Sequence, residues 1–145
     1  MSRIRVLLDD PWTLPRLIGG LTTVYSVAIT AAPVLLAKPA RLTGPDGSVP
    51  PATAALIRSI GSRDAAMAAA LLVAPAGRSS TLLSVARAVS DAGDALWFGR
   101  LLDSRRDVLK VAGAALGWSV LELAAAARAE RRAASGRPGW RVLLK

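Results

Sequence analysis

The chain has 145 residues, of which 52% are hydrophobic and 20% are charged, and it contains no cysteine and no histidine. These two absences exclude disulfides, thiol chemistry, haem ligation by histidine and the common zinc sites, so we expect no metal and no cofactor. The mean hydropathy of +0.40 is high for a soluble domain, and the formal net charge is +9. This combination favours an integral membrane protein.

Apolar residues gather into four blocks of roughly 20 residues each, the length that crosses the hydrocarbon core of a bilayer. The blocks are Leu14 to Leu36, Ala54 to Ala74, Ser80 to Leu102 and Val108 to Ala127. The first is too long for the apolar region of a signal peptide, so we expect a retained span, bent by Pro33 near its end. A Pro- and Gly-rich stretch from 38 to 51 and the turn at Pro75 and Gly77 separate the next blocks.

These blocks predict an all-α protein, a bundle of four transmembrane helices in one domain. We expect an N-terminal interfacial segment over residues 1–13, a four-helix membrane domain over 14–128 and a basic cytoplasmic tail over 129–145. A soluble four-helix protein is the alternative. Against it, the run from Ala65 to Val73 is apolar around the whole helix. A chain of this length cannot bury four such helices on every side.

Lysine and arginine are distributed unequally between the two sides of the predicted membrane domain. Nine of them lie in the two terminal segments and at Arg78, whereas four lie in the other two loops. The positive-inside rule then places both termini in the cytoplasm. The basic residues border apolar spans and no nucleic-acid motif accompanies them, so we expect membrane lipid and not nucleic acid as a partner.

Ionisable residues also lie within the predicted spans, where charge is costly and side chains face the bundle interior or one another. At 1.5 Å per residue, Arg63 and Asp91 fall at about the same depth near the mid-plane. Arg87 and Glu122 fall one to two turns nearer the cytoplasmic side. We therefore predict two layers of ion pairs, Arg63 with Asp91 and Arg87 with Glu122.

The third block presents a polar face towards this interior. Arg87, Asp91 and Asp94 are spaced i, i+4 and i+7, which places them on one side of a helix, and Phe98 continues that side. By depth, Tyr25 of the first block reaches the mid-plane layer.

The spans contain three arginines (Arg58, Arg63 and Arg87) and four acids, so we expect one acid to keep its proton near neutral pH. A protonated acid beside an ionised one can supply a proton donor and a base. We predict Asp94 as the donor, Asp91 as the carboxylate held by arginine, and Glu122 as a reserve acid. The predicted substrate-binding residues are Tyr25, Arg63, Asp64, Arg87, Phe98 and Trp118.

Glycine and tryptophan have simpler interpretations. We expect Gly61, Gly93, Gly113 and Gly117 to be points of close helix packing. We expect Trp12, Trp97 and Trp140 to be anchors at the membrane interface.

The segment Arg58-Ser59-Ile60-Gly61-Ser62-Arg63-Asp64, followed by an alanine-rich run and a third span that carries aspartates, resembles the family of small four-helix bacterial membrane proteins called DUF4267, near the DoxX-like proteins. The resemblance covers residues 14–128. It implies the four-helix fold and a location in the bacterial inner membrane. It implies no activity, because the function of that family is undefined.

Two classes of function remain open. The first is a cofactor-free acid/base enzyme that isomerises, cyclises or opens an epoxide in a hydrophobic small molecule, since such chemistry needs a positioned acid, a carboxylate and an apolar pocket. The second is a lipid-binding or assembly subunit of a membrane complex, in which the charges serve packing. A homo-oligomer is compatible with both classes. Transport would require one, because the chain has no detectable inverted repeat.

Overall fold

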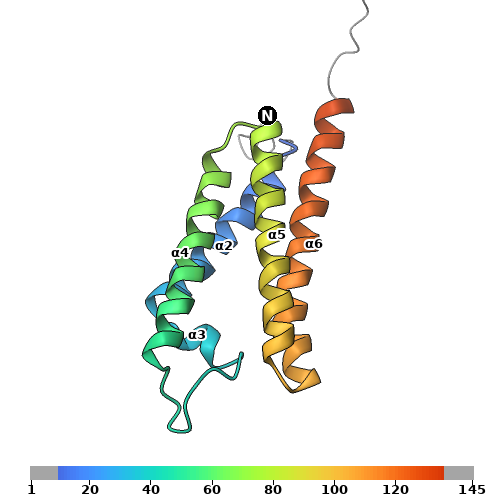
Figure 1. Ribbon diagram of the computed structural model, residues 1–145. Helices are drawn as coiled ribbons and strands as arrows, with labels where there is room; N and C mark the ends of the chain where they lie inside the picture. The colour runs from blue at the N-terminus through green and yellow to red at the C-terminus, as the bar shows by residue number, and fades with distance from the viewer. Residues whose placement is uncertain (1–9, 136–145) are drawn as a thin grey trace, which may run out of the picture.

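The computed structural model describes residues 10–135, and this part of the chain is helical, with no strand (Figure 1). The prediction of an all-α protein is confirmed. The helices are α2 (Thr13–Ala31), α3 (Val34–Ala37), α4 (Pro51–Val73), α5 (Arg78–Leu101) and α6 (Arg105–Ser135). The first predicted span is broken in two at Pro33, because proline lacks the N–H that a continuous helix would use.

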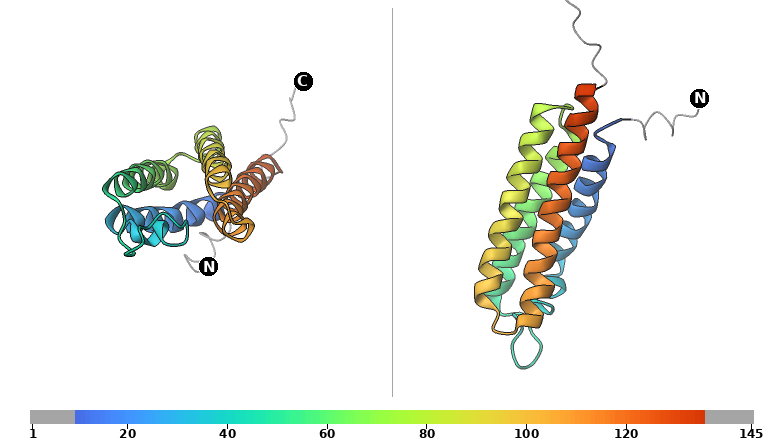
Figure 2. Two further views of the ribbon diagram at one scale, coloured as in Figure 1. Left: turned by 60° about the horizontal axis from the view of Figure 1, so that its bottom comes forward. Right: turned by 90° about the vertical axis from the view of Figure 1, so that its right-hand side faces the viewer.

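The four long helices run alternately up and down the bundle (Figure 1). Helix α2 packs closely along α4, and α5 packs closely along α6, whereas the two pairs contact each other more sparsely. The left view in Figure 2, tilted towards one end of the bundle, shows α4 beside α2 and α5 beside α6. The start of α2, the turn between α4 and α5 and the end of α6 lie at one end of the bundle, and α3 and the loop that follows it lie at the other.

Helix α6 is longer than the sequence analysis predicted. The fourth span was expected to end at Ala127 and to be followed by a tail, but the helix continues to Ser135. The added residues are mostly alanine, arginine and glutamate, which have high helix propensity. The Thr81 hydroxyl also donates a hydrogen bond of 2.5 Å to the Glu130 carboxylate, which ties this extension to α5. Residues 136–145, with Trp140, lie outside the described range.

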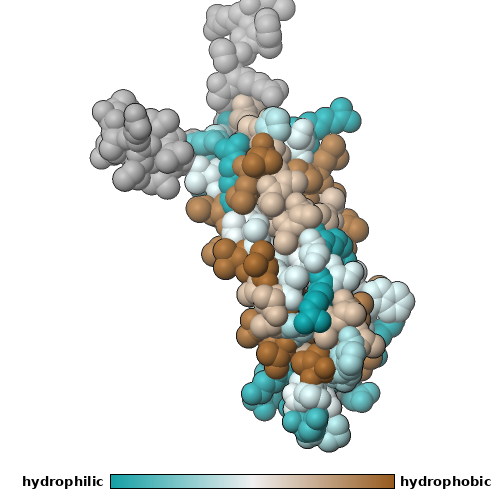
Figure 3. Space-filling view, turned by 90° about the vertical axis from the view of Figure 1, so that its left-hand side faces the viewer, coloured by the Kyte–Doolittle hydropathy of each residue, from teal (hydrophilic) through white to brown (hydrophobic). Residues whose placement is uncertain are grey.

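Among the described helices, α6 alone is long and apolar enough to cross a membrane by length and composition. Large apolar side chains are exposed on every long helix, including Leu17, Val24, Leu56, Val89 and Val120. Figure 3 shows hydrophobic residues along one face, with hydrophilic residues at both ends and also between them near the middle.

The buried side chains of the bundle are mostly small or polar. The apolar ones include many alanines, with a small cluster around Ile29 and Ile57. The buried polar residues are Thr22, Ser26, Ser80, Ser84, Arg87, Asp91, Asp107, Ser119 and Glu122. Small and polar residues inside with large apolar residues outside are typical of helix packing in membranes.

Gly61 is a point of close contact between α4 and α2. A Cβ at Gly61 would overlap the Thr30 hydroxyl and would lie 2.8 Å from the carbonyl oxygen of Ser26. The other three predicted packing glycines, Gly93, Gly113 and Gly117, would meet no described atom within 4 Å, so that prediction is wrong for them. Gly113 and Gly117 are four residues apart, a spacing that allows close helix packing only where another helix lies against that face.

Of the tryptophans predicted as interface anchors, Trp12 and Trp97 lie in different environments. Trp12 is buried at the start of α2 and is not an exposed anchor. Trp97 is 68% exposed near the end of α5, as an anchor would be, and the Arg100 guanidinium lies 5.5 Å from the centre of its ring.

We predict that Gly61→Ala lowers the free energy of unfolding by about 1–3 kcal/mol, because the added methyl group overpacks the contact with α2. Gly113→Ala is the matched control. It adds the same methyl group to open space and should be neutral or stabilise by up to about 1 kcal/mol. Thermal unfolding in detergent, followed by circular dichroism, measures both. Equal melting temperatures for the two variants would contradict the packing assigned to Gly61.

Candidate functional site

Arg87 is the centre of a polar network inside the bundle. Its side chain is 1% exposed, and its Nε donates a hydrogen bond of 2.6 Å to Oε1 of Glu122, whose side chain is fully buried. The predicted pairing of these two residues is therefore found. The two other guanidinium nitrogens donate to the backbone oxygen of Asp64 at 3.3 Å and to the Thr22 hydroxyl at 3.4 Å. One side chain thus connects all four long helices.

The Thr22 hydroxyl completes this network from α2. It donates to the carbonyl oxygen of Ile18 at 3.0 Å and accepts from Arg87 and from Nε1 of Trp118, the latter at 2.9 Å. These three bonds use the one donor and two acceptor positions that a hydroxyl has. The Trp118 ring is thereby fixed at the interior. Thr22 was not among the predicted site residues, although it lies one turn before Tyr25 on the same helix.

Arg63 pairs with a different aspartate from the one predicted. Its Nη2 lies 2.8 Å from Oδ2 of Asp94, and its Nε lies 2.9 Å from Oδ1 of the neighbouring Asp64. The predicted pair with Asp91 is not formed. Asp91 lies instead near Arg87, with 3.7 Å between Oδ2 and Nη2, which is too long for a hydrogen bond. Depth along the helices was matched correctly, but the rotation of α5 decides which aspartate faces α4.

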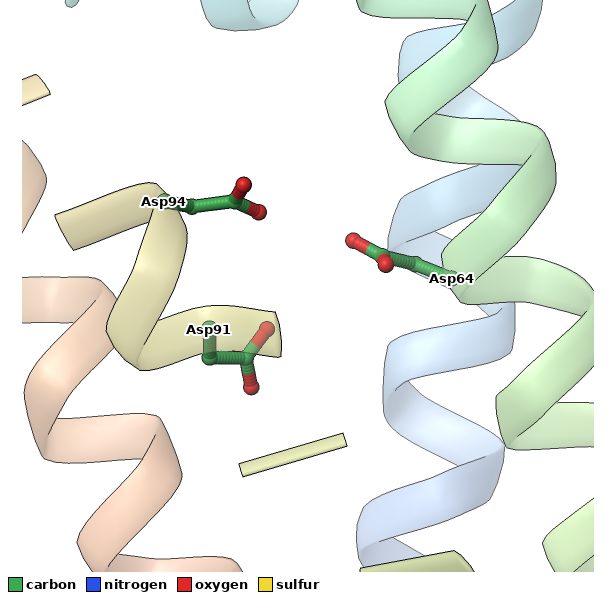
Figure 4. A group of neighbouring side chains, drawn as sticks. All are labelled: Asp64, Asp91 and Asp94. Carbon is green, nitrogen blue, oxygen red and sulfur yellow. The ribbon is translucent and has the colours of Figure 1, made fainter. Parts of the chain in front are cut away.

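The three aspartates converge between α4 and α5 (Figure 4). One carboxylate oxygen from each of Asp64, Asp91 and Asp94 lies within 4.8 Å of the other two. Carboxylate oxygens suit hard cations such as Mg²⁺ or Ca²⁺, so this is the group in the described chain that could hold a metal ion.

A cavity of about 590 Å³ opens beside the aspartates, in the space between the two helix pairs. One end is polar and includes Asp64, Arg87, Asp91 and Asp94. The rest of the wall is mainly apolar, with polar groups on Thr22, Ser26, Tyr25, Trp118 and Lys110. The remaining lining residues are Leu21, Thr22, Tyr25, Ser26, Ile29, Leu36, Pro39, Ile60, Phe98, Lys110, Val111, Ala114, Ala115 and Trp118. A volume of this size is typical of small-molecule sites.

Seven of the nine predicted site residues line the cavity: Tyr25, Asp64, Arg87, Asp91, Asp94, Phe98 and Trp118. The other two, Arg63 and Glu122, lie behind this wall as partners of Asp94 and Arg87. Lys110 was missed because it lies near the start of α6, where a lysine in the sequence resembles any other membrane-surface charge.

The acids of this network outnumber the arginines. Arg58 was counted among the interior charges but is exposed. The Arg63 side chain is also 41% exposed but pairs with Asp64 and Asp94, so the network contains Arg63 and Arg87 against four carboxyl groups. Two buried carboxylate oxygens, Oδ2 of Asp91 and Oε2 of Glu122, have no hydrogen-bond partner in the part of the chain that is described. The network is therefore incompletely satisfied next to the cavity.

Comparison of the chain with protein-family models, with curated proteins and with solved structures finds no match.

Loss of either partner of the buried pair should cost far more stability than loss of a comparable exposed pair. We predict that Arg87→Met, which leaves Glu122 as an uncompensated buried charge, destabilises the protein by about 3–5 kcal/mol. Adding Glu122→Met should restore much of this loss, because no unpaired charge then remains.

The control is Arg16→Met. Arg16 lies 2.6 Å from Asp10, the same distance as in the buried pair, but both side chains are about one-third exposed. This change should cost at most about 1 kcal/mol. Chemical denaturation in detergent measures all three variants, and similar losses for Arg87→Met and Arg16→Met would show that the buried network is not structurally central.

Proposed function

We propose that the chain is an integral membrane protein of the bacterial inner membrane that crosses the bilayer four times and performs acid/base chemistry on a hydrophobic small molecule. The observation that carries this proposal is the 590 Å³ cavity that joins an apolar wall to a cluster of carboxyl groups. A fully paired interior without a cavity would have favoured the alternative of an assembly subunit.

The exposed large apolar side chains on α2, α4, α5 and α6 support a bilayer around the bundle. Helices α4 and α5 carry several charges, which lower their hydropathy, and these charges include the ones that build the network. Arg63 and Asp64 lie in the middle of α4, and Arg87, Asp91 and Asp94 lie in the middle of α5. Polar residues that face a bundle interior lower the hydropathy of a span without contacting lipid.

The contacts suggest the reverse of the roles expected for the two α5 aspartates. Asp94 accepts a hydrogen bond from Arg63, which favours its ionised form, so we assign it as the base. Asp91 is nine-tenths buried and its Oδ2 has no hydrogen-bond partner among the described residues, which favours a neutral carboxylic acid, so we assign it as the proton donor. Both line the cavity.

The apolar part of the cavity would exclude bulk water from a substrate beside these two acids. Isomerisation, cyclisation and epoxide opening all require a proton donor and a group that accepts a proton or stabilises positive charge. None of them requires a metal. The reserve acid Glu122 is separated from the cavity by Arg87, so we assign it to holding that arginine in place.

The membrane topology makes one prediction. A reporter fused after Arg41, in the loop that follows α3, should lie outside the cytoplasm, whereas one fused after Lys145 should lie inside it. A paired alkaline phosphatase and green fluorescent protein assay distinguishes the two locations. Two fusions on the same side would contradict four spans with both termini in the cytoplasm.

The chemical proposal makes another. We expect Asp91→Asn and Asp94→Asn each to reduce turnover at least about 100-fold, because positioned acid/base groups contribute that much or more. The native chain is replaced by either variant in the cells that naturally make it, and lipid extracts of these cells are compared with extracts of unmodified cells. The variant extracts should lack a product that has the same elemental composition as its substrate, as isomerisation and cyclisation require. Chromatography with mass spectrometry detects it. Asp103→Asn, in the exposed turn before α6, is the control.

Melting temperatures of the purified variants separate loss of activity from loss of folding. Extracts that are unchanged in folded Asp91→Asn and Asp94→Asn proteins would remove the support for catalysis and favour a lipid-binding or assembly role.

A further inference from the structure

We propose that the cavity selects hydrophobic cations, meaning an apolar molecule with a substituted ammonium group or another delocalised positive charge. This inference rests on the proposed binding of a hydrophobic small molecule and names the class of ligand. Its basis is the charge of the polar end together with the aromatic residues around it.

The first observation is the charge balance. Four carboxyl groups face two arginines in the network, so the polar end is negative even when Asp91 holds a proton. Uncompensated charge is costly at membrane depth. Asp64, Asp91 and Asp94 all line the cavity, and therefore a cation in it would lie next to the excess charge. An anion of the same shape would be repelled.

The second observation is the unsatisfied oxygen. Oδ2 of Asp91 is buried without a hydrogen-bond partner in the described chain, although it lies 3.7 Å from Nη2 of Arg87. The three guanidinium nitrogens of Arg87 already donate to other acceptors. Arg63 is likewise engaged by Asp64 and Asp94. Both arginines have N–H groups left over, but none of them forms a hydrogen bond with Oδ2 of Asp91 in this packing, so a cationic ligand in the cavity is an available counterpart.

The third observation is the aromatic content of the wall. The chain has only four Trp, one Tyr and one Phe, yet Tyr25, Phe98 and Trp118 all line this cavity. The Trp118 ring is held there by its bond to Thr22. Aromatic faces attract cations, and the attraction increases when water is excluded. Carboxylates and aromatic rings around one apolar space form a site for a bulky cation, whereas a small hydrated metal ion gains little from the rings.

Lys110 is the one cavity-lining charge that opposes this selection. It lies about 12 Å along α6 from Trp118, at 1.5 Å per residue, and it is exposed. Arg87 is paired with Glu122, which lies outside the lining. Lys110 forms no ion pair among the described residues, and the three lining aspartates still outnumber the two lining cations.

Tetraphenylphosphonium and tetraphenylborate test this inference, because the two ions have four phenyl groups on one central atom and opposite charge. We expect the purified full-length protein in neutral detergent to bind tetraphenylphosphonium at least 10-fold more tightly than tetraphenylborate, measured by equilibrium dialysis. The net charge of +9 favours the anion everywhere else on the chain, so general electrostatic attraction cannot produce this result.

Variants locate the site. Asp94→Asn should weaken phosphonium binding about 10-fold. Asp91→Asn should do the same, because a cation bound in the cavity favours the ionised form of Asp91. Asp103→Asn should leave binding unchanged. Phe98→Leu keeps the wall apolar and should weaken it about threefold through loss of one aromatic face. Melting temperatures identify any variant that fails to fold. The variants that do fold then show whether the phosphonium ion binds in the cavity.

Equal or tighter binding of tetraphenylborate would overturn the proposal, and so would phosphonium binding that is unaffected by the two aspartate variants. A neutral photoreactive probe, a long-chain alcohol bearing a diazirine, distinguishes a cavity that lacks cation selectivity from a cavity that binds no hydrophobic molecule. Labelling of cavity residues by the alcohol without cation selectivity would leave the hydrophobic site intact. Absence of labelling at the cavity would remove the site and the cation inference with it.

Discussion

The bundle depends on one buried interaction, the pair between Arg87 and Glu122. An arginine with 1% of its side chain exposed must have every nitrogen satisfied, and here the three acceptors come from α2, α4 and α6. Each of those helices is thereby held at a fixed height relative to α5. The small residues around the network allow this, because serine and alanine leave room for a guanidinium group between helices.

The same interaction explains why the interior contains a cavity. The two helix pairs are tightly packed within themselves, at Gly61 between α4 and α2 and along the contact of α5 with α6. Between the pairs, the long side chains of Arg87 and Trp118 reach across to the Thr22 hydroxyl and to the backbone oxygen of Asp64. Long side chains hold helices apart, so space remains beside them.

Much of the fold could be predicted from the sequence, because block length and proline positions determine where helices begin and end. Counting residues along each helix to estimate depth correctly paired Arg87 with Glu122. It also placed together most of the predicted site residues that line the cavity. It could not decide between Asp91 and Asp94 as the partner of Arg63. These aspartates differ by about 4.5 Å of helix rise, and a flexible arginine reaches either. Only the rotation of α5, which tertiary packing sets, makes the choice.

That choice matters chemically, because it divides the two aspartates into different environments. Asp94 shares Arg63 with Asp64, so three charged groups form a mutually satisfied set at the edge where α4 meets α5. Asp91, one turn away, has only a distant arginine and faces the cavity. Two carboxyl groups on one helix face thus differ in what stabilises their charge, and such a difference separates an acid from a base. Any ligand that satisfies Asp91 would also interact with the hydrogen-bonded contacts that join the helix pairs. Binding at this site would therefore be coupled to the packing of the whole bundle.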